Sequence, residues 1–271
     1  MSFTVLGAEG FIGGRLKARL VERGLAVRAP TRAELPAVEG DLGHVIYAIG
    51  VTADFRRRPW DTVAAHVSLL SEILQRVRCE SFLYLSSTRV YARAPSTRED
   101  AALTVSPADP DDLYNLSKLA GEAICLAQSG GTVRVARLSN VYGFEAVSEN
   151  FLPRLIRDAL QAHRIVLRSA ADSAKDYISV HAAADRLIDI ALGGRHRLYN
   201  VASGVNTRAG DIAEAIGRAA CASVEVEAGA PEVTFAPIDV SRLSAEFRHQ
   251  PSPVLADVPD LVAAYRRELR P

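Results

Sequence analysis

A short apolar run followed at once by three spaced glycines restricts the fold of this chain more than any other feature. Residues 3–6 (FTVL) have the length and composition of a buried strand, and the segment GAEGFIGGRLKARLVERG then places Gly7, Gly10 and Gly13 at the start of a helical pattern. Glycine allows a tight turn and a close approach of the backbone to a pyrophosphate, whose charge is favoured by the free N–H groups of a helix start. The order strand, glycine turn and helix, ended at Gly24, therefore predicts a dinucleotide-binding unit.

Tyr114 and Lys118 are four residues apart in a segment, LYNLSKLAGEAICLAQ, whose apolar spacing is helical. Their side chains should therefore project from one face, about one turn apart. Free tyrosine titrates near ~10, and proton transfer near neutral pH requires about 4 kcal/mol of phenolate stabilisation, much of which a neighbouring ammonium can supply. We interpret the pair as an acid/base unit, although the same spacing also arises by chance on helix surfaces.

Hydroxyl side chains gather at the end of the apolar strand predicted in the segment SFLYLSSTRVYA, residues 81–92. The carboxyl ends of parallel strands border the ligand crevice of such sheets, so Ser87 is placed to hydrogen-bond a substrate oxygen beside Tyr114. Thr88 is a further candidate for substrate binding. For Ser86 we favour ordinary turn chemistry after a strand.

With these motifs the chain resembles the extended short-chain dehydrogenases/reductases of the nucleotide-sugar epimerase/dehydratase type. The similarity runs over nearly the whole length, in the order glycine turn, SSTRVYA, YNLSKLAGE, VARLSNVYG, KDYISVHAAAD, LYNVASG and DVSRL. The resemblance implies that Ser87 orients the substrate oxygen, that Tyr114 is the acid/base, and that Lys118 binds the nicotinamide ribose and lowers the pKa of Tyr114. The cofactor contacts that it implies at the glycine turn and after the strand at 45–49 are Gly7, Gly10, Phe11, Ile12, Gly13, Ala48, Ile49 and Gly50.

Strand and helix patterns alternate to about residue 140, which favours an α/β fold with a Rossmann-type doubly wound parallel sheet. We expect an NAD(P)-binding domain at 1–140 with a return segment at about 175–200, and mainly a small C-terminal substrate-binding cap at 141–271, with an amphipathic helix at 151–163. Only about fifteen residues separate the strands near 25–29 and 45–49, too few for a full helix-plus-strand unit. One peripheral helix should therefore be lost or reduced to a turn.

The end of the second strand carries the signal for the cofactor. A carboxylate there accepts hydrogen bonds from the adenosine ribose of NAD, whereas an arginine pairs with the extra phosphate of NADP. This chain has Thr31 and Arg32 at that place, which favours NADP(H). NAD(H) stays open as the alternative, with Glu34 reaching the ribose.

The reaction is restricted by Thr88 and Arg89, which stand where sugar dehydratases of the resembled family carry an acid pair. Arginine stays protonated at any working pH and cannot take a proton from a sugar carbon, so dehydration is disfavoured. Reversible hydride transfer at a sugar carbinol or ketone needs only Ser87, Tyr114, Lys118 and the nicotinamide. We expect a nucleotide-sugar 4-ketoreductase, with a nucleotide-sugar 4-epimerase as the alternative.

For the substrate, the resemblance assigns Asn140 to the sugar or its diphosphate, with support from Asn150. It also places Lys175 where the family commonly has an arginine that binds the diphosphate, and lysine lacks the bidentate fork of arginine. His66 replaces an asparagine of the resembled family, and Ala182 replaces an acid. A reductase of a small non-sugar carbonyl and a non-catalytic dinucleotide-binding regulator therefore stay as rivals, although regulators usually lose the tyrosine or lysine.

Composition agrees with a globular enzyme and restricts its partners. Lys plus Arg and Asp plus Glu balance at 32 each in 271 residues, so no overall field favours nucleic acid or an anionic membrane. No uncharged stretch approaches the ~20 residues that span a bilayer, and six dispersed histidines lack metal-ligand spacing. Three distant cysteines favour a reducing compartment, so we expect a cytoplasmic protein. We expect no bound metal, and a homodimer stays open.

Overall fold

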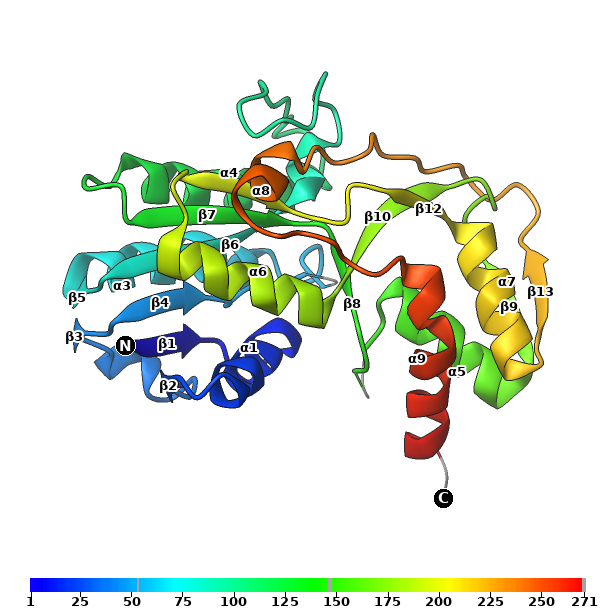
Figure 1. The fold of residues 1–271 in the computed structure, drawn as a ribbon. Coiled ribbons are helices and arrows are strands. Elements are labelled where there is room, and N and C mark those ends of the chain that lie inside the picture. The colour runs from blue at the N-terminus through cyan, green and yellow to red at the C-terminus, as the bar shows by residue number, and fades with distance from the viewer. Residues whose placement is uncertain (53, 146–147, 270–271) are drawn as a thin grey trace. The chain divides into compact units, whose positions relative to one another are not determined.

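The structure, a computed structural model, describes residues 1–52, 54–145 and 148–269 (Figure 1). The chain forms two compact units, each built from three stretches of sequence. Unit 1 consists of Met1–Ser139, Val180–Val201 and Asp239–His249, and unit 2 of Asn140–Ser179, Ala202–Ile238 and Gln250–Pro271. The segment that returns to unit 1 is Val180–Val201, and Asp239–His249 also belongs to unit 1, while the expected division into a cofactor-binding domain and a substrate-binding cap stays a prediction.

Unit 1 contains a six-stranded sheet in which every neighbouring pair is parallel. In spatial order its strands are β11 (Leu198–Val201), β7 (Val133–Leu138), β6 (Ser81–Ser87), β4 (His44–Tyr47), β1 (Ser2–Leu6) and β2 (Ala26–Arg28). Helices α1 (Phe11–Glu22) and α6 (Val180–Gly193) cover one face, and α3 (Leu69–Arg76) and α4 (Asp112–Ala127) cover the other (Figure 1). This arrangement confirms the predicted Rossmann-type doubly wound sheet.

The connection between β2 and β4 is as short as the sequence spacing predicts. It contains one turn of 3₁₀ helix, η1 (Leu35–Ala37), and a two-residue strand, β3 (Gly40–Asp41), that pairs with β5 (Val77–Arg78) outside the main sheet. Among the described residues no strand pairs with the outer side of β2, so β2 is an edge of the sheet.

Shorter elements of unit 1 lie between the main strands and helices. They are α2 (Pro59–Val63), the π-helix η2 (Ala64–Ser68), the 3₁₀ helix η3 (Thr88–Tyr91) and α8 (Ser241–Glu246). The η2 segment joins α2 directly to α3, so these three elements form one continuous, locally widened helical segment.

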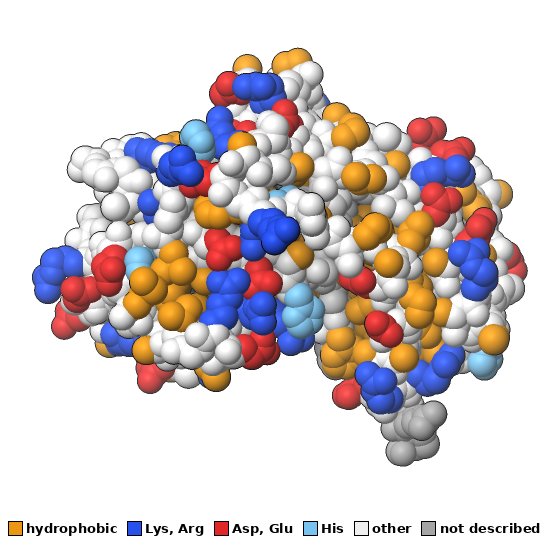
Figure 2. Space-filling view, in the orientation of Figure 1, with side chains coloured by type: hydrophobic (Ala, Val, Ile, Leu, Met, Phe, Trp, Pro, Cys, Tyr) orange, Lys and Arg blue, Asp and Glu red, His pale blue; other side chains and the backbone are white. Residues whose placement is uncertain are grey.

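An ion-pair cluster joins α1 to α6 on the outer face of unit 1. Arg19 donates to both carboxylate oxygens of Asp185, at 2.6 and 3.1 Å, and Arg23 contacts Asp185 and Asp189. Figure 2 shows acidic and basic side chains side by side over these two helices. Bidentate arginine–carboxylate pairs have specific geometry, so this cluster fixes how α6 docks on α1.

Unit 2 has small sheets and three helices around its own core. Strand β10 (Ala174–Ser179) pairs with β8 (Asn140–Tyr142) in parallel and with β12 (Asn206–Arg208) antiparallel, while β9 (Arg164–Leu167) pairs with β13 (Ser223–Val226). The helices are α5 (Phe151–Ala162), α7 (Ala209–Ala220) and α9 (Val254–Glu268). Helix α5 is the amphipathic helix that the sequence predicts at 151–163, and it ends where His163 turns to a left-handed conformation at φ 51°.

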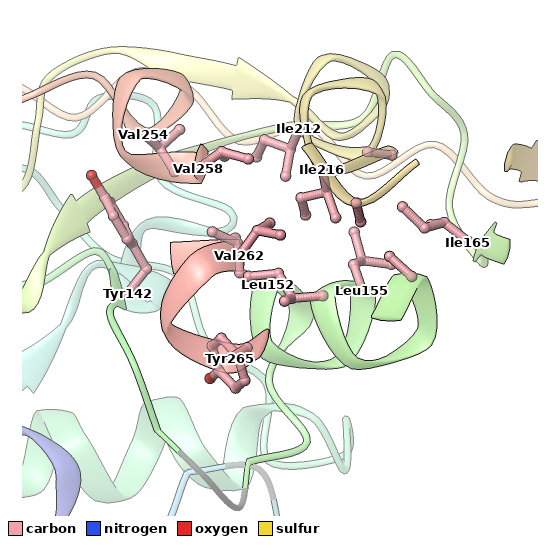
Figure 3. Packing of buried hydrophobic residues seen from close by; sticks show 14 of the residues in the cluster. Tyr142, Leu152, Leu155, Ile165, Ile212, Ile216, Val254, Val258, Val262 and Tyr265 are labelled. Atoms are coloured by element: carbon pink, nitrogen blue, oxygen red, sulfur yellow. The ribbon is translucent and has the colours of Figure 1, made fainter. Parts of the chain in front are cut away.

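The core of unit 2 forms where the apolar faces of its three helices meet. Leu152 and Leu155 of α5, Ile212 and Ile216 of α7, and Val258 and Val262 of α9 point toward one another (Figure 3). All six side chains are buried, and each such side chain contributes about 1.5–3 kcal/mol when it leaves water. Unit 2 therefore has a core of its own. In the described part of the chain, no helix has the length and apolar character needed to cross a membrane.

Candidate active site

The glycine turn between β1 and α1 has the tight geometry that the sequence predicts. Gly7 has a φ of +89°, which strains any residue with a side chain, and a Cβ on Gly13 would lie 2.1 Å from the carbonyl oxygen of Gly7. Gly10 is the N-cap of α1, where no side chain accepts from the free N–H groups and no acidic residue lies in the first turn. This helix start fits a pyrophosphate, because its donors lack an internal partner.

The segment after β4 packs against this turn. A Cβ on Gly7 would lie 3.0 Å from the backbone of Ala48 and from the side chain of Ile49. At Gly50, a Cβ would lie 3.1 Å from Nε2 of His66 and 3.5 Å from Nζ of Lys118. The structure thus brings the predicted cofactor residues of the glycine turn beside Ala48 and Ile49, and it brings Gly50 beside Lys118.

After β2, Glu34 folds back on its own chain. Its carboxylate accepts hydrogen bonds from the backbone N–H and the hydroxyl of Thr31, at 2.7 and 2.9 Å, and these bonds lower the pKa of Glu34. Arg32 is exposed and has neither a hydrogen bond nor an ion pair with any residue that the structure describes. The carboxylate of Glu34 therefore stays ionised but is bonded to Thr31, while the guanidinium donors of Arg32 have no bonded partner among the described residues.

Ser87, Tyr114 and Lys118 lie together at the carboxyl end of β6. Ser87 is the last residue of β6, and its side chain acts on Tyr114 of α4 by opposing the rise in the pKa of the phenol. One turn further along α4, Lys118 donates from Nζ to the carbonyl oxygen of Leu85 at 2.8 Å, and this nitrogen lies 5.9 Å from the centre of the Tyr114 ring. Tyr114 and Lys118 are only 7 % and 4 % exposed, so the predicted acid/base unit is a buried one.

The electrostatics of the pair differ from the expectation that Lys118 lowers the pKa of Tyr114. Burial raises the pKa of Tyr114, and the effects that oppose this rise are the side chain of Ser87 and the charge of Arg89. Burial also lowers the pKa of Lys118 to about 7, against the opposing charge of Glu122. Near neutral pH the ammonium is therefore only partly charged, and the net shift at Tyr114 is upward.

His66 connects the loop after β4 to α4, a role that the sequence did not reveal. Its Nε2 accepts from the backbone N–H of Val51 at 3.3 Å, so the proton resides on Nδ1, which donates to Oγ of Ser117 at 2.8 Å. Ser117 in turn donates to the carbonyl oxygen of Tyr114 at 2.9 Å. The imidazole ring is fully buried and meets the Tyr114 ring edge to face at 5.4 Å. The sequence showed only that His66 replaces an asparagine of the resembled family, and this replacement did not predict these contacts.

Phe55 and Arg89 complete the surroundings of Tyr114, and sequence reasoning missed both contacts. The Phe55 ring lies 5.5 Å from the Tyr114 ring and is almost fully buried. The guanidinium of Arg89 lies 4.9 Å from the centre of the Phe55 ring and 5.6 Å from that of the Tyr114 ring. The spacing of these three residues along the chain contains no signal that they meet.

The predicted substrate residues are divided between the two units. Thr88 is buried in η3 of unit 1, next to Ser87. In unit 2, Asn140 begins β8 and donates from its side chain to the carbonyl oxygen of Asp176 at 2.7 Å, while Lys175 lies on the paired strand β10, over the ring of Phe235 at 5.5 Å.

Asn150 is the N-cap residue of α5, where its side chain makes no capping hydrogen bond. The structure thus brings Asn140 and Lys175 onto paired strands, with Asn150 at the start of a neighbouring helix of the same unit. Across the described residues, no group of three metal-ligating side chains is close enough to hold a metal ion.

Comparison with known proteins gives related sequences and related folds. Residues 3–202 match the sequence profile of the NAD dependent epimerase/dehydratase family. A curated relative, dTDP-glucose 4,6-dehydratase of Streptomyces niveus, is 28 % identical over 179 residues, which cover 64 % of this chain and 51 % of the relative. The chain therefore matches about half the length of that curated protein.

Two solved structures share the fold across almost the whole chain. The structure of RMD from Pseudomonas aeruginosa complexed with NADPH has a TM-score of 0.80 and 23 % identity, covering 98 % of this chain and 99 % of that one. UDP-glucuronic acid 4-epimerase from Bacillus cereus, in complex with UDP-glucuronic acid and NAD, has a TM-score of 0.78 and 18 % identity, covering 100 % of both chains.

Proposed function

Because the chain belongs to the NAD dependent epimerase/dehydratase family, we propose that it reduces the 4-keto group of a nucleotide-linked sugar with NADPH. The observation that carries the proposal is the cluster at the carboxyl end of β6, in which half-buried Ser87 accompanies buried Tyr114 and Lys118. Reversible hydride transfer at a carbinol needs a proton donor and a group that orients the oxygen, roles that suit Tyr114 and Ser87, and Lys118 in its protonated form is the cation.

The reduction needs one proton, which comes from Tyr114. NADPH, when bound, supplies the hydride that the sugar carbon receives. The hydroxyl of Tyr114 donates its proton to the ketone oxygen, and Ser87 at the end of β6 orients that oxygen. The upward shift in the pKa of Tyr114 favours the protonated phenol, which is the form that a ketone reductase requires before each turnover. Lys118 would hold the nicotinamide ribose.

The preference for NADP(H) over NAD(H) is supported by the end of the second strand. The carboxylate of Glu34 is bonded to Thr31, which leaves the unpaired guanidinium of Arg32 available for the additional phosphate of NADP. The structural relative RMD was solved with NADPH, whereas the 4-epimerase was solved with NAD, so both cofactors occur on this fold.

Dehydration is the main rival reaction, since the curated relative is a dTDP-glucose 4,6-dehydratase. That reaction removes a proton from a sugar carbon and expels water, and the chain has Thr88 and Arg89 where the dehydratases carry their additional acid and base. A guanidinium stays protonated and cannot act as the base. Epimerisation at the same carbon needs no further side chain, so it stays as the alternative.

One assay separates these reactions. The purified protein is incubated with a panel of nucleotide-linked 4-keto sugars and their 4-hydroxy parent sugars, each with and without NADPH, while the absorbance of the reduced nicotinamide is followed and the products are analysed. The proposal expects stoichiometric consumption of NADPH and a 4-hydroxy product. Interconversion of 4-stereoisomers without added cofactor would show an epimerase, and formation of a 4-keto-6-deoxy sugar from the parent sugar would show a dehydratase; either result without NADPH consumption contradicts the proposal.

A further inference from the structure

Arg89 holds a positive charge against the catalytic tyrosine. It is the second residue of η3, and its backbone N–H donates to Oγ of Ser87 at 3.2 Å, so its position is tied to the end of β6. The side chain lies over the rings of Phe55 and Tyr114, with the guanidinium carbon 4.9 and 5.6 Å from their centres. A cation over aromatic faces is held in place by the electrostatics of the rings.

The guanidinium of Arg89 has no hydrogen-bond acceptor among the residues that the structure describes. Its nearest acid is Asp111, whose oxygen lies 3.9 Å from Nη2, too far for a hydrogen bond. The other oxygen of Asp111 accepts from Nε of Arg56 at 2.5 Å. Since one carboxylate faces two guanidinium groups, the cluster of Arg56, Arg89 and Asp111 carries one surplus positive charge.

Arg137 is a buried arginine of unit 1 whose hydrogen bonds differ from those of Arg89. Its guanidinium makes bidentate hydrogen bonds to the carboxylate of Glu122 and a further bond to the hydroxyl of Tyr91. Arg89 is 34 % exposed in its side chain, and its desolvation lowers its pKa, yet no carboxylate bonds to it. Partial desolvation of a guanidinium whose N–H donors are unbonded costs free energy, and a bound anion would offset this cost.

We propose that Arg89 is a specificity-determining residue that binds a carboxylate carried by the substrate on the carbon next to the reacting one. The inference rests on the proposed function. The proposed mechanism places the reacting oxygen at the hydroxyls of Ser87 and Tyr114, and Arg89 adjoins both residues, through its backbone N–H on Ser87 and its guanidinium 5.6 Å from the centre of the Tyr114 ring. In a nucleotide-linked uronic acid, the carboxylate is attached to C5, adjacent to the reacting C4. The planar fork of arginine matches a carboxylate with two parallel hydrogen bonds.

The inference is tested by measuring binding in the full chain loaded with NADP⁺. Titration calorimetry compares UDP-glucuronic acid, UDP-glucose and UDP on the unmodified protein and on Arg89→Gln, Arg89→Lys and Arg98→Gln, and the corresponding dTDP series repeats the comparison. Arg98→Gln is the control, because it removes an exposed guanidinium of unit 1 that is bonded to Asp100 and leaves the cluster of Arg56, Arg89 and Asp111 unchanged. Circular dichroism and thermal unfolding confirm that each variant is folded.

The unmodified protein should bind the carboxylated sugar more tightly than the neutral sugar by roughly 10- to 100-fold, the range for a hydrogen bond to a charged group. Arg89→Gln should bring this ratio close to one without changing the affinity for the free nucleoside diphosphate, and Arg98→Gln should preserve the ratio. Arg89→Lys should restore part of the preference, since it keeps the charge without the fork.

Three results would overturn the inference. One is no preference for the carboxylated sugar in either nucleotide series, another is a preference that persists in Arg89→Gln, and the third is an equal loss for the free nucleoside diphosphate, which would place the guanidinium on the diphosphate. NADPH-dependent reduction of neutral 4-keto sugars without such a preference would leave the proposed function intact while removing the role of Arg89. A preference for the carboxylated sugar without hydride transfer would support the role of Arg89 and remove the proposed function.

Discussion

The phenol of Tyr114 lies in a buried site, and burial raises its pKa against the opposing effects of Ser87 and Arg89. Tyr114→Phe keeps the ring and its contacts with Phe55 and His66 but removes the transferable proton, so turnover should fall by at least ~10²-fold. Stopped-flow measurement of nicotinamide oxidation gives the rate, and NADPH titration checks that cofactor binding persists. Tyr199→Phe, which removes a hydroxyl bonded to Glu246, is the control that should retain turnover. Near-normal turnover in Tyr114→Phe would exclude the proposed mechanism.

His66 gives a prediction for the pH dependence of stability. Burial and the charge of Lys118 lower the pKa of His66 to about 2, whereas an unfolded histidine titrates near ~6.5. Because the unfolded chain binds the additional proton between these two values, the stability associated with the neutral ring is complete above about pH 6.5 and is lost as the pH falls toward the folded pKa.

The variant His66→Asn should remove this dependence. It keeps a side chain that can accept from Val51 and donate to Ser117, and its unfolding free energy should fall less steeply below about pH 6.5, by up to about 1.4 kcal/mol per pH unit. Urea unfolding across this pH range measures the slope. His163→Asn changes an exposed histidine at a left-handed position that asparagine tolerates, and it should leave the slope unchanged. Identical slopes in His66→Asn and the unmodified protein would contradict the prediction.

At the scale of elements, α4 reaches its place because it has a glycine where it crosses η2 and β6. A Cβ on Gly121 would lie 2.6 Å from the hydroxyl of Tyr84 and 2.7 Å from the carbonyl oxygen of His66. Tyr84 donates to that same carbonyl, and Tyr47 donates to the carbonyl of Ala65, so two buried tyrosines satisfy backbone oxygens of the π-helix. The widened turn that holds His66 therefore depends on close packing against α4.

Gly121→Ala should push α4 away from η2 and lower the free energy of unfolding by about 1–3 kcal/mol, as overpacking does. Gly193→Ala is the control, because a Cβ on this glycine of α6 meets no atom within 4 Å, and alanine favours a helix. Chemical denaturation compares the two variants. A stability of Gly121→Ala equal to that of Gly193→Ala would show that the packing is not tight.

Elements whose signals are local in the sequence could be predicted, and contacts between distant segments could not. The strand, glycine turn and helix at residues 2–22, the short connection after β2 and the helix that holds Tyr114 and Lys118 each follow from spacing within a few residues. The π-helix at 64–68 arises because its carbonyl oxygens meet two tyrosines from separate strands, which no spacing reveals. The upward shift in the pKa of Tyr114 likewise depends on burial, a property of the assembled unit.

For the whole molecule, cofactor binding should appear as added stability. A ligand that binds only the folded chain adds about 2.7 kcal/mol at a hundred times its dissociation constant. NADPH should therefore raise the unfolding temperature more than NADH at equal concentration. Arg32→Ala should remove this difference, whereas Arg28→Ala at the end of β2 should weaken it less. Thermal unfolding with each cofactor measures the effect, and equal shifts from NADPH and NADH in the unmodified protein would contradict the cofactor assignment.

The interleaving of the two units along the chain has a consequence for biosynthesis. Strand β7 ends at Leu138, but its partner β11 begins only at Leu198, after most of the strands of unit 2 have been made. On the ribosome, β7 therefore stays an open edge with unpaired backbone groups, the kind of surface that recruits other chains. Closing the sheet across this separation is slow. The interval between synthesis of these two strands is thus when the nascent chain should be most prone to aggregate and to bind chaperones.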